Sequence, residues 1–256
     1  MAIQPITDVM PPIFVINLDR DLDRLEAVRN NLGALGLTFV RIPGVLGKDL
    51  PDWLKHVDKK AYGWRNRQDL PRAGEVGCYL SHLKAIETFL KTDAAWCVIL
   101  EDDAQLLPDC REVLEALGGR SDWDVVKLFN FHSGFPVRRK RLTPKHDLVI
   151  HLARTTSAAA YALNRKAAEV LARTLLPMSE QLDHAHDRPW ETGLRIRGVR
   201  PMPAALMPET SSASTIGYQD RHRSDRGLVK SARLFLSRTK KETLRLIHAL
   251  LEAVKH

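Results

Sequence analysis

The sequence has few cysteines, and their arrangement argues against two kinds of structure. Three occur among the 256 residues, at Cys78, Cys97 and Cys110. The number is odd and no pair has the CxxC spacing of a thiolate zinc site. We therefore expect neither a disulfide framework nor a cysteine-based zinc centre. We interpret all three as ordinary buried residues.

Long apolar runs are also missing. No stretch reaches the roughly 18 apolar residues that a membrane-spanning helix requires. The N-terminal MAIQPITDVMPP lacks the basic start and apolar core of a secretory signal. We therefore expect a cytoplasmic protein, with peripheral contact to the inner face of a membrane as an option. The 44% of hydrophobic and 27% of charged residues are ordinary for a soluble domain, and the length suffices for one large domain and a tail.

Apolar strands alternate with amphipathic helices along most of the chain. Residues 13–18 (IFVINL) predict a buried strand, a helix with leucines and valine three and four apart follows, and residues 38–45 predict a second strand. This is the opening βαβ unit of a nucleotide-binding α/β domain. Further helices are expected at 74–92, 110–117 and 165–176, further strands at 95–103, 123–129, 157–164 and 195–200, an irregular excursion at 47–72, a loop or hairpin at 134–148 and a polar loop at 210–217.

The strongest chemical signal is Glu101-Asp102-Asp103, which ends the apolar strand. Three adjacent carboxylates repel one another, so burying them without a cation is costly. Open α/β sheets bind ligands at the carboxyl ends of strands, and Mg²⁺ and Mn²⁺ prefer oxygen ligands. Alternation along a strand predicts that Glu101 and Asp103 face one ion and Asp102 faces a ribose or a basic group, unless the strand turns there. A solvated strand-to-turn transition is the alternative.

Three blocks of sequence occur together between residues 15 and 106: VINLDRDLDR, GEVGCYLSHLKAI and VILEDDAQL. In this order and spacing they resemble glycosyltransferase family 25, the lipooligosaccharide-type galactosyltransferases, which are similar to the collagen galactosyltransferases. The resemblance covers roughly residues 12 to 217. It implies a GT-A-like fold with a mixed central sheet flanked by helices, a UDP-sugar donor (UDP-galactose first), a Mn²⁺ or Mg²⁺ ion and inversion at the anomeric carbon.

The resemblance also assigns positions in the three blocks. These are Asn17, Leu18, Asp19 and Arg24 in the first, Gly74, Glu75, Gly77, Ser81 and His82 in the second, and Glu101, Asp102 and Asp103 in the third. Ser81 and His82 lie on a helix that otherwise packs into the core. We assign both to the donor site, while a hydrogen-bonded structural role is the alternative for a lone helical histidine.

The first block suits the two ends of a nucleotide. Asn17 and Leu18 would offer amide and backbone groups to a uracil ring at the end of the first strand. Arg24 would meet the diphosphate, because a guanidinium fork suits phosphate oxygens. The alternative for Arg24 is an ion pair on the helix surface with Asp21 or Asp23.

A second polar cluster lies at Gln181 to Glu191 (QLDHAHDRPWE). An inverting transfer needs a base that takes the proton of the acceptor hydroxyl. The resemblance points to Asp183, although the family's Pro-Val pair before the acid is missing here, and Asp187 is the second candidate. His184 or His186 would complete a metal shell. The alternative is a polar surface loop.

From about residue 227 the pattern changes to one long basic amphipathic helix, which we separate as a tail (227–256) from a catalytic domain (12–220). Much of the net charge of +8 sits there and just upstream. Such a helix is typical of binding to an anionic membrane surface, and a helix docked on the domain is the alternative. No recognition motif accompanies the charge, so we expect no nucleic acid. The cations are Arg221, Arg223, Arg226, Lys230, Arg233, Arg238, Lys240, Lys241, Arg245 and Lys255.

The sequence thus predicts a metal-assisted, inverting glycosyltransferase. It would move a hexose, galactose by resemblance, from a UDP-sugar to a glycan or glycolipid such as a lipopolysaccharide or lipooligosaccharide core. Two rivals differ in class. One is a non-catalytic sugar-nucleotide or glycan-binding protein of the same fold, and the other is a metal-dependent phosphoesterase.

Overall fold

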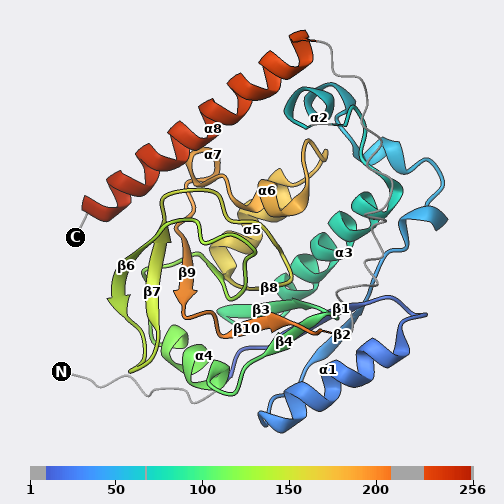
Figure 1. Ribbon diagram of the computed structural model, residues 1–256. Coiled ribbons are helices and arrows are strands. Elements are labelled where there is room, and N and C mark those ends of the chain that lie inside the picture. Colours follow the sequence, from blue (N-terminus) through green and yellow to red (C-terminus); the bar gives the residue numbers. More distant parts are fainter. Residues whose placement is uncertain (1–9, 67, 209–227, 255–256) are drawn as a thin grey trace.

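A mixed β-sheet of eight strands forms the centre of the molecule (Figure 1). The computed structural model describes residues 10–66, 68–208 and 228–254. The strands of the sheet are β1 (Ile13–Asn17), β2 (Val40–Pro43), β3 (Trp96–Glu101), β5 (Val125–Lys127), β6 (Pro136–Arg141), β7 (Asp147–His151), β8 (Ala160–Asn164) and β9 (Ile196–Arg200). Their order is β2-β1-β3-β8-β5-β9-β7-β6. A separate ladder pairs β4 (Ala104–Leu106) with β10 (Ala204–Leu206).

Helices flank this sheet on both faces, which confirms the predicted fold class. They are α1 (Leu22–Ala34), α2 (Lys59–Arg65), α3 (Ala73–Leu90), α4 (Cys110–Gly118), α5 (Arg165–Thr174), α6 (Leu182–His186), α7 (Pro189–Thr192) and α8 (Leu228–Val254), with two short 3₁₀ turns, η1 (Gly47–Asp49) and η2 (Trp53–His56). Within the described residues, no helix is both long enough and apolar enough to cross a bilayer.

The directions of the strands bring several loops to one edge of the sheet. β1 runs parallel to β2 and to β3, and β5 runs parallel to β9. β8 is antiparallel to both β3 and β5, so β3 and β5 point the same way. The carboxyl ends of all five parallel strands therefore meet at a single edge. This is where open α/β sheets bind ligands.

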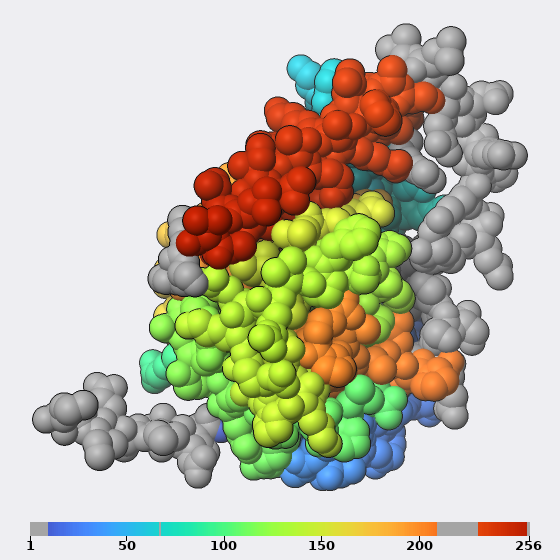
Figure 2. All heavy atoms as spheres, turned by 60° about the vertical axis from the view of Figure 1, so that its left-hand side comes forward, coloured from blue at the N-terminus to red at the C-terminus, as the bar shows by residue number. Residues whose placement is uncertain are grey.

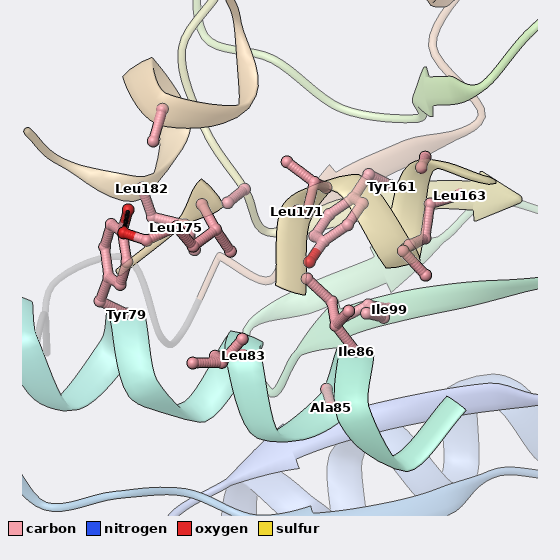
Figure 3. Close-up of a cluster of buried hydrophobic side chains, with 14 of the residues drawn as sticks. Tyr79, Leu83, Ala85, Ile86, Ile99, Tyr161, Leu163, Leu171, Leu175 and Leu182 are labelled. Atoms are coloured by element: carbon pink, nitrogen blue, oxygen red, sulfur yellow. Dashed lines mark hydrogen bonds between the residues drawn. The ribbon is translucent and has the colours of Figure 1, made fainter. Parts of the chain in front are cut away.

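Two hydrophobic cores lie on opposite faces of the sheet. Along β1, Phe14 and Ile16 belong to the core shared with α3 and α5, while Ile13 and Val15 belong to the core shared with α1 and α4. A strand buried on both faces has to be apolar at every position, which explains the unbroken run in the sequence. Figure 3 shows the first core, where side chains of α3, β3, β8 and α5 meet.

Two segments differ from the sequence prediction. The excursion at 47–72 contains α2, whose N-cap Asp58 accepts a hydrogen bond from the Ala61 amide at 2.9 Å. The polar cluster at 181–191 folds as α6 and α7 and is not a surface loop, since Asp187 and His186 are buried. Helices of four to seven residues are too short to show a helical period. The strand β8 followed by α5, and the hairpin β6–β7, are as predicted.

The predicted C-terminal helix exists, but two of its cations, Lys241 and Arg245, face the domain. α8 lies along the domain, as the docked-helix alternative requires (Figure 1). Arg245 forms an ion pair with Asp187 at 3.2 Å, and Lys241 pairs with Glu180. The expectation that these two cations face a membrane is therefore wrong. Residues 210–217, Arg221, Arg223, Arg226 and Lys255 lie outside the described residues.

One close contact fixes the helix that carries the second sequence block. A Cβ at Gly77 on α3 would lie 2.4 Å from the Val45 carbonyl oxygen and 2.6 Å from the Gly47 amide nitrogen. Both are backbone atoms of the loop after β2, so neither can move aside as a flexible side chain would. α3 can approach this loop only because residue 77 is glycine.

We predict that Gly77→Ala lowers the free energy of unfolding by about 1–3 kcal/mol, because the added methyl overpacks a rigid contact. Gly33→Ala on α1 is the matched control, since nothing lies within 4 Å of its Cβ position. It should raise the stability by up to about 1 kcal/mol through helix propensity. Urea unfolding monitored by circular dichroism measures both. Equal stability of the two variants would contradict the packing.

Candidate functional site

The predicted site residues gather where β1 and β3 end side by side. Ile16 lies in register with Glu101 across the pair, so Asn17 and the acidic motif are neighbours. β3 stops at Glu101, and Asp102 and Asp103 form a turn before β4. Strand alternation therefore does not extend past Glu101. The chain turns at Asp102, which was the exception allowed for in the sequence prediction. The three acids separate into two groups.

The first group is centred on Arg24 of α1. Its Nη1 lies 3.1 Å from Asp102 Oδ1 and its Nη2 lies 3.4 Å from Asp103 Oδ2. Asn17 Nδ2 donates to Asp102 Oδ2 at 2.8 Å. Within the described residues, Arg24 thus pairs with the acidic motif and not with Asp21 or Asp23.

Asp102 therefore meets a basic group, as one of the two sequence expectations had it. Burial raises the pKa of Asp102, and Arg24 and Asn17 oppose that rise by favouring the ionised form. Both of its carboxylate oxygens are engaged, so Asp102 orients Arg24 and Asn17.

The second group is centred on Glu101. Its Oε1 lies 3.1 Å from Nε2 of His82, whose Nδ1 lies 3.0 Å from the Tyr161 hydroxyl. The thiol of Cys78 lies 3.9 Å from the same Oε1. Burial raises the pKa of Cys78 and of Tyr161 well above their usual values, so both stay protonated near neutral pH. A hydrogen bond from His82 Nε2 to the Glu101 carboxylate leaves Nδ1 to accept from the Tyr161 hydroxyl.

Two predicted donor-site residues mainly hold the backbone around this edge. Ser81 is buried, its hydroxyl donates to the Gly77 carbonyl at 2.7 Å and accepts from the Val45 amide at 2.8 Å. It therefore joins α3 to the loop after β2. Leu18 is half-buried, and its carbonyl accepts the Asp21 amide at 3.0 Å in the turn before α1. Both residues shape the site without presenting free polar side chains to it.

The two candidate bases lie at opposite ends of α6: Asp183 is in its first turn and Asp187 directly follows its last residue. Asp183 is half-buried, and its Oδ2 accepts from the Ser157 amide at 3.2 Å. Ser157 has φ +98°, a backbone region that non-glycine residues rarely adopt and that clusters at functional sites. The negative charge of Asp183 contributes to the raised pKa of Cys78. Cys78 in turn lies 3.9 Å from Glu101 Oε1, so the charge of Asp183 acts on the cluster around Glu101.

Asp187 is enclosed. Its carboxylate pairs with Arg245 at 3.2 Å and accepts from the Thr155 amide at 3.4 Å. Burial raises its pKa, and the positive charges of Lys127 and Arg245 oppose that rise. A carboxylate held by buried cations is poorly suited to collect a proton from a substrate. Of the two candidates, the geometry favours Asp183.

The carboxylates at the end of β3 are suited to a divalent cation. Asp103 Oδ1 is buried and has no hydrogen-bond partner among the described residues. Burial and the neighbouring charge of Glu101 raise the pKa of Asp103 to about 7, against the opposing effect of Arg24. One arginine thus fails to neutralise the group. A Mn²⁺ or Mg²⁺ ion at Asp103 and Glu101 would supply the missing positive charge.

A different set of ligand atoms also comes together around Glu101. Cys78 Sγ, His82 Nε2 and a Glu101 oxygen lie within 4.8 Å of one another. Among the described residues, these three are the ones that come together closely enough to hold one metal ion. Sulfur and imidazole suit zinc-like ions better than Mg²⁺. His184 and His186, predicted to complete a metal shell, do not belong to it. His186 is buried with its ring 5.0 Å from that of Tyr161, and burial lowers its pKa well below the usual value.

Sequence reasoning missed Cys78 and Tyr161. Cys78 precedes His82 by one helical turn, so the spacing alone placed it on the same face of α3. Tyr161 lies in an apolar strand and carries no local signal. Only the pairing of β8 with β3, where Ile99 faces Tyr161, brings its hydroxyl to His82.

We predict a pH-dependent stabilisation by Asp103→Asn in metal-free protein. A folded-state pKa of about 7 against about 3.9 in the unfolded chain means that the folded state binds more protons between these values. Wild-type stability therefore falls as pH rises through this window. The stability of Asp103→Asn relative to wild type should grow by about 1–3 kcal/mol from pH 5 to pH 8.

Thermal unfolding in chelator at several pH values measures this difference. Asp93→Asn, at an exposed loop position, is the matched control and should show a flat difference. An equally flat difference for Asp103→Asn would mean that its carboxylate is not strained in the fold.

Comparison with known proteins agrees with these features. A family model described as glycosyltransferase family 25 (LPS biosynthesis protein) matches residues 10–188, well over half of the chain. The chain belongs to glycosyltransferase family 25. The match contains Asn17, Arg24, the acidic motif and Asp183, and it ends one residue after Asp187.

Relatives in insects carry the same family name. A "Glycosyltransferase 25 family member" from Aedes aegypti is 31% identical over 129 residues, which is 44% of this chain and 20% of the relative. One from Anopheles gambiae is 30% identical over 131 residues, 44% of this chain and 21% of the relative. The alignment thus spans about a fifth of the length of these relatives.

Proposed function

We propose that this chain is an inverting, metal-assisted glycosyltransferase that moves a hexose from a UDP-sugar to a glycan acceptor. The observation that carries the proposal is the under-neutralised pair Glu101 and Asp103 at the carboxyl ends of parallel strands, beside Arg24 and Asn17. Membership of glycosyltransferase family 25 supports the reaction class and a nucleotide-sugar donor.

Each part of a sugar nucleotide has a counterpart at this edge. The backbone near Leu18 lies at the end of β1, where a uracil ring would bind. Contrary to the sequence expectation, the amide of Asn17 is not free for the ring, because it is buried, donates to the Asp21 carbonyl oxygen and Asp102 Oδ2, and accepts from Arg41 Nε. Arg24 is 18% exposed at its side chain and forks toward the acids, so it can also approach a diphosphate. The ion would offset the charge that builds on the leaving diphosphate.

On the acceptor side, Asp183 is the proposed base. It is half-buried, lies on α6 beside the strained Ser157, and has no buried cation as its own partner among the described ion pairs. A lipopolysaccharide or lipooligosaccharide core is the acceptor we propose, and galactose the sugar. The family description, which names LPS biosynthesis, supports the proposed acceptor.

Turnover tests the proposal directly. UDP-galactose and UDP-glucose are incubated with the chain and Mn²⁺, with and without a glycolipid extract, and free UDP is measured. We expect release that requires the ion and rises with acceptor. Asp103→Ala should abolish it, while the control Asp93→Ala should keep it. Full turnover by Asp103→Ala, or by metal-stripped protein, would contradict the mechanism.

The same assay separates the rivals. A non-catalytic binder gives heat on titration with the UDP-sugar and releases no UDP. A phosphoesterase releases phosphate from simple esters without an acceptor.

The identity of the base has its own test. Asp183→Asn keeps the shape of the side chain and should lower kcat by roughly 10²- to 10⁴-fold while UDP-sugar binding is retained. Asp187→Asn should mainly destabilise the fold, since it leaves Lys127 and Arg245 as buried cations. Steady-state kinetics, calorimetric donor binding and thermal unfolding are compared for both. Wild-type kcat in Asp183→Asn would remove it as the base.

A further inference from the structure

The C-terminal helix α8 docks on the domain through a side that carries both charged and apolar residues, and it leaves further apolar residues exposed. Its inward side carries Arg245 and Lys241, which pair with the buried acids Asp187 and Glu180. Glu252, also on that side, pairs with Arg197 at 2.8 Å. A helix in a globular protein normally turns its apolar side to the core. α8 docks through these ion pairs together with the buried Leu234 and Ala249, and the aliphatic residues of its C-terminal half that lie on the other side stay exposed.

The outward side forms a continuous apolar stripe on the C-terminal half of α8. We define the outer stripe as Leu246, Ile247, Leu250, Leu251 and Val254, spaced at one and three or four residues. Their exposed fractions run from 42% for Leu246 to 83% for Val254. No charged residue interrupts this stripe between Leu246 and Val254 on the same side. Contiguous apolar surface of this kind marks an interaction site more often than chance exposure.

A cationic hairpin lies at the C-terminal end of the outer stripe. Arg139 of the β6–β7 hairpin donates to the Ala253 carbonyl at 3.3 Å, so the hairpin lies against the end of α8. Arg138 and Lys140 on that hairpin are exposed, as is Lys240 on the helix itself. Figure 2 shows α8 and the strands below it on one face of the molecule.

We propose that the outer stripe inserts into the surface of an anionic lipid membrane, with the hairpin cations on the headgroups. An apolar helix side bordered by Lys and Arg is the arrangement of helices that lie in the membrane interface. The cations of the hairpin at one end of the stripe favour an anionic lipid surface over a second copy of this chain. This inference does not depend on the proposed reaction.

The residues that would contact the lipid in this arrangement are not the ones expected from the sequence. The helix does not bind through Lys241 and Arg245, since the domain already neutralises them. The lipid is met by the aliphatic residues of the outer stripe and by the cations of a hairpin distant in sequence. Binding should therefore need both apolar insertion and lipid charge.

Sedimentation with vesicles tests the proposal on the full chain. Vesicles of phosphatidylcholine with one third phosphatidylglycerol are compared with pure phosphatidylcholine. We expect partition to the anionic vesicles at least tenfold above the neutral ones. Ile247→Ser with Leu250→Ser should lower it at least tenfold, and Arg138→Gln with Lys140→Gln should lower it severalfold.

The matched control is Leu22→Ser with Val40→Ser, which replaces two aliphatic residues of α1 and β2 that are at least as exposed, without changing charge. It should bind as wild type does, and thermal unfolding shows that each variant is folded. Equal binding by the outer-stripe variant and the control, or no binding by wild type, would overturn the proposal. A dimer seen by light scattering and dissolved by the outer-stripe variant would also overturn it, because it assigns the stripe to a second copy.

Discussion

The balance of charge at the end of β3 is the constraint on which the site depends. A strand buried on both faces delivers three carboxylates to one point, and water cannot solvate them fully. The fold disperses them by turning the chain after Glu101. Glu101 goes to the imidazole of His82, and the two aspartates go to Arg24. Asp103 Oδ1 stays without a hydrogen-bond partner among the described residues. A bound cation would neutralise the negative charge of this carboxylate.

Local sequence signals were sufficient for most of the fold. The apolar runs of β1 and β3 and the stripe on α3 have strong periods, and each element formed where expected. The carboxyl ends of parallel strands then placed Asn17 beside the acidic motif without further information. Short elements such as α2 and α6 were not predictable, because four to seven residues carry too little period.

Long-range pairing accounts for what could not be predicted in the site. Strand alternation is a property of the strand alone, so it could not reveal a turn at Asp102. Arg24 lies on a helix, and its partners Asp102 and Asp103 lie in a turn almost eighty residues later in the chain, so a near neighbour such as Asp21 was an equally reasonable guess. Tyr161 reaches His82 only through the antiparallel ladder of β8 on β3.

The sheet order also shows that the residues matched by the family model are not a complete folding unit. The matched residues end at 188, but β9 (Ile196–Arg200) lies inside the sheet, between β5 and β7. A fragment cut at the end of the match would lose the interior strand β9. The β6–β7 hairpin would then have no neighbouring strand to join it to the rest of the sheet. It would also leave Asp187 and Glu180 without the cations of α8. The boundary of similarity in sequence is therefore not a boundary of cooperative folding. β9 and α8, which lie outside the residues matched by the family model, therefore help to stabilise the matched region.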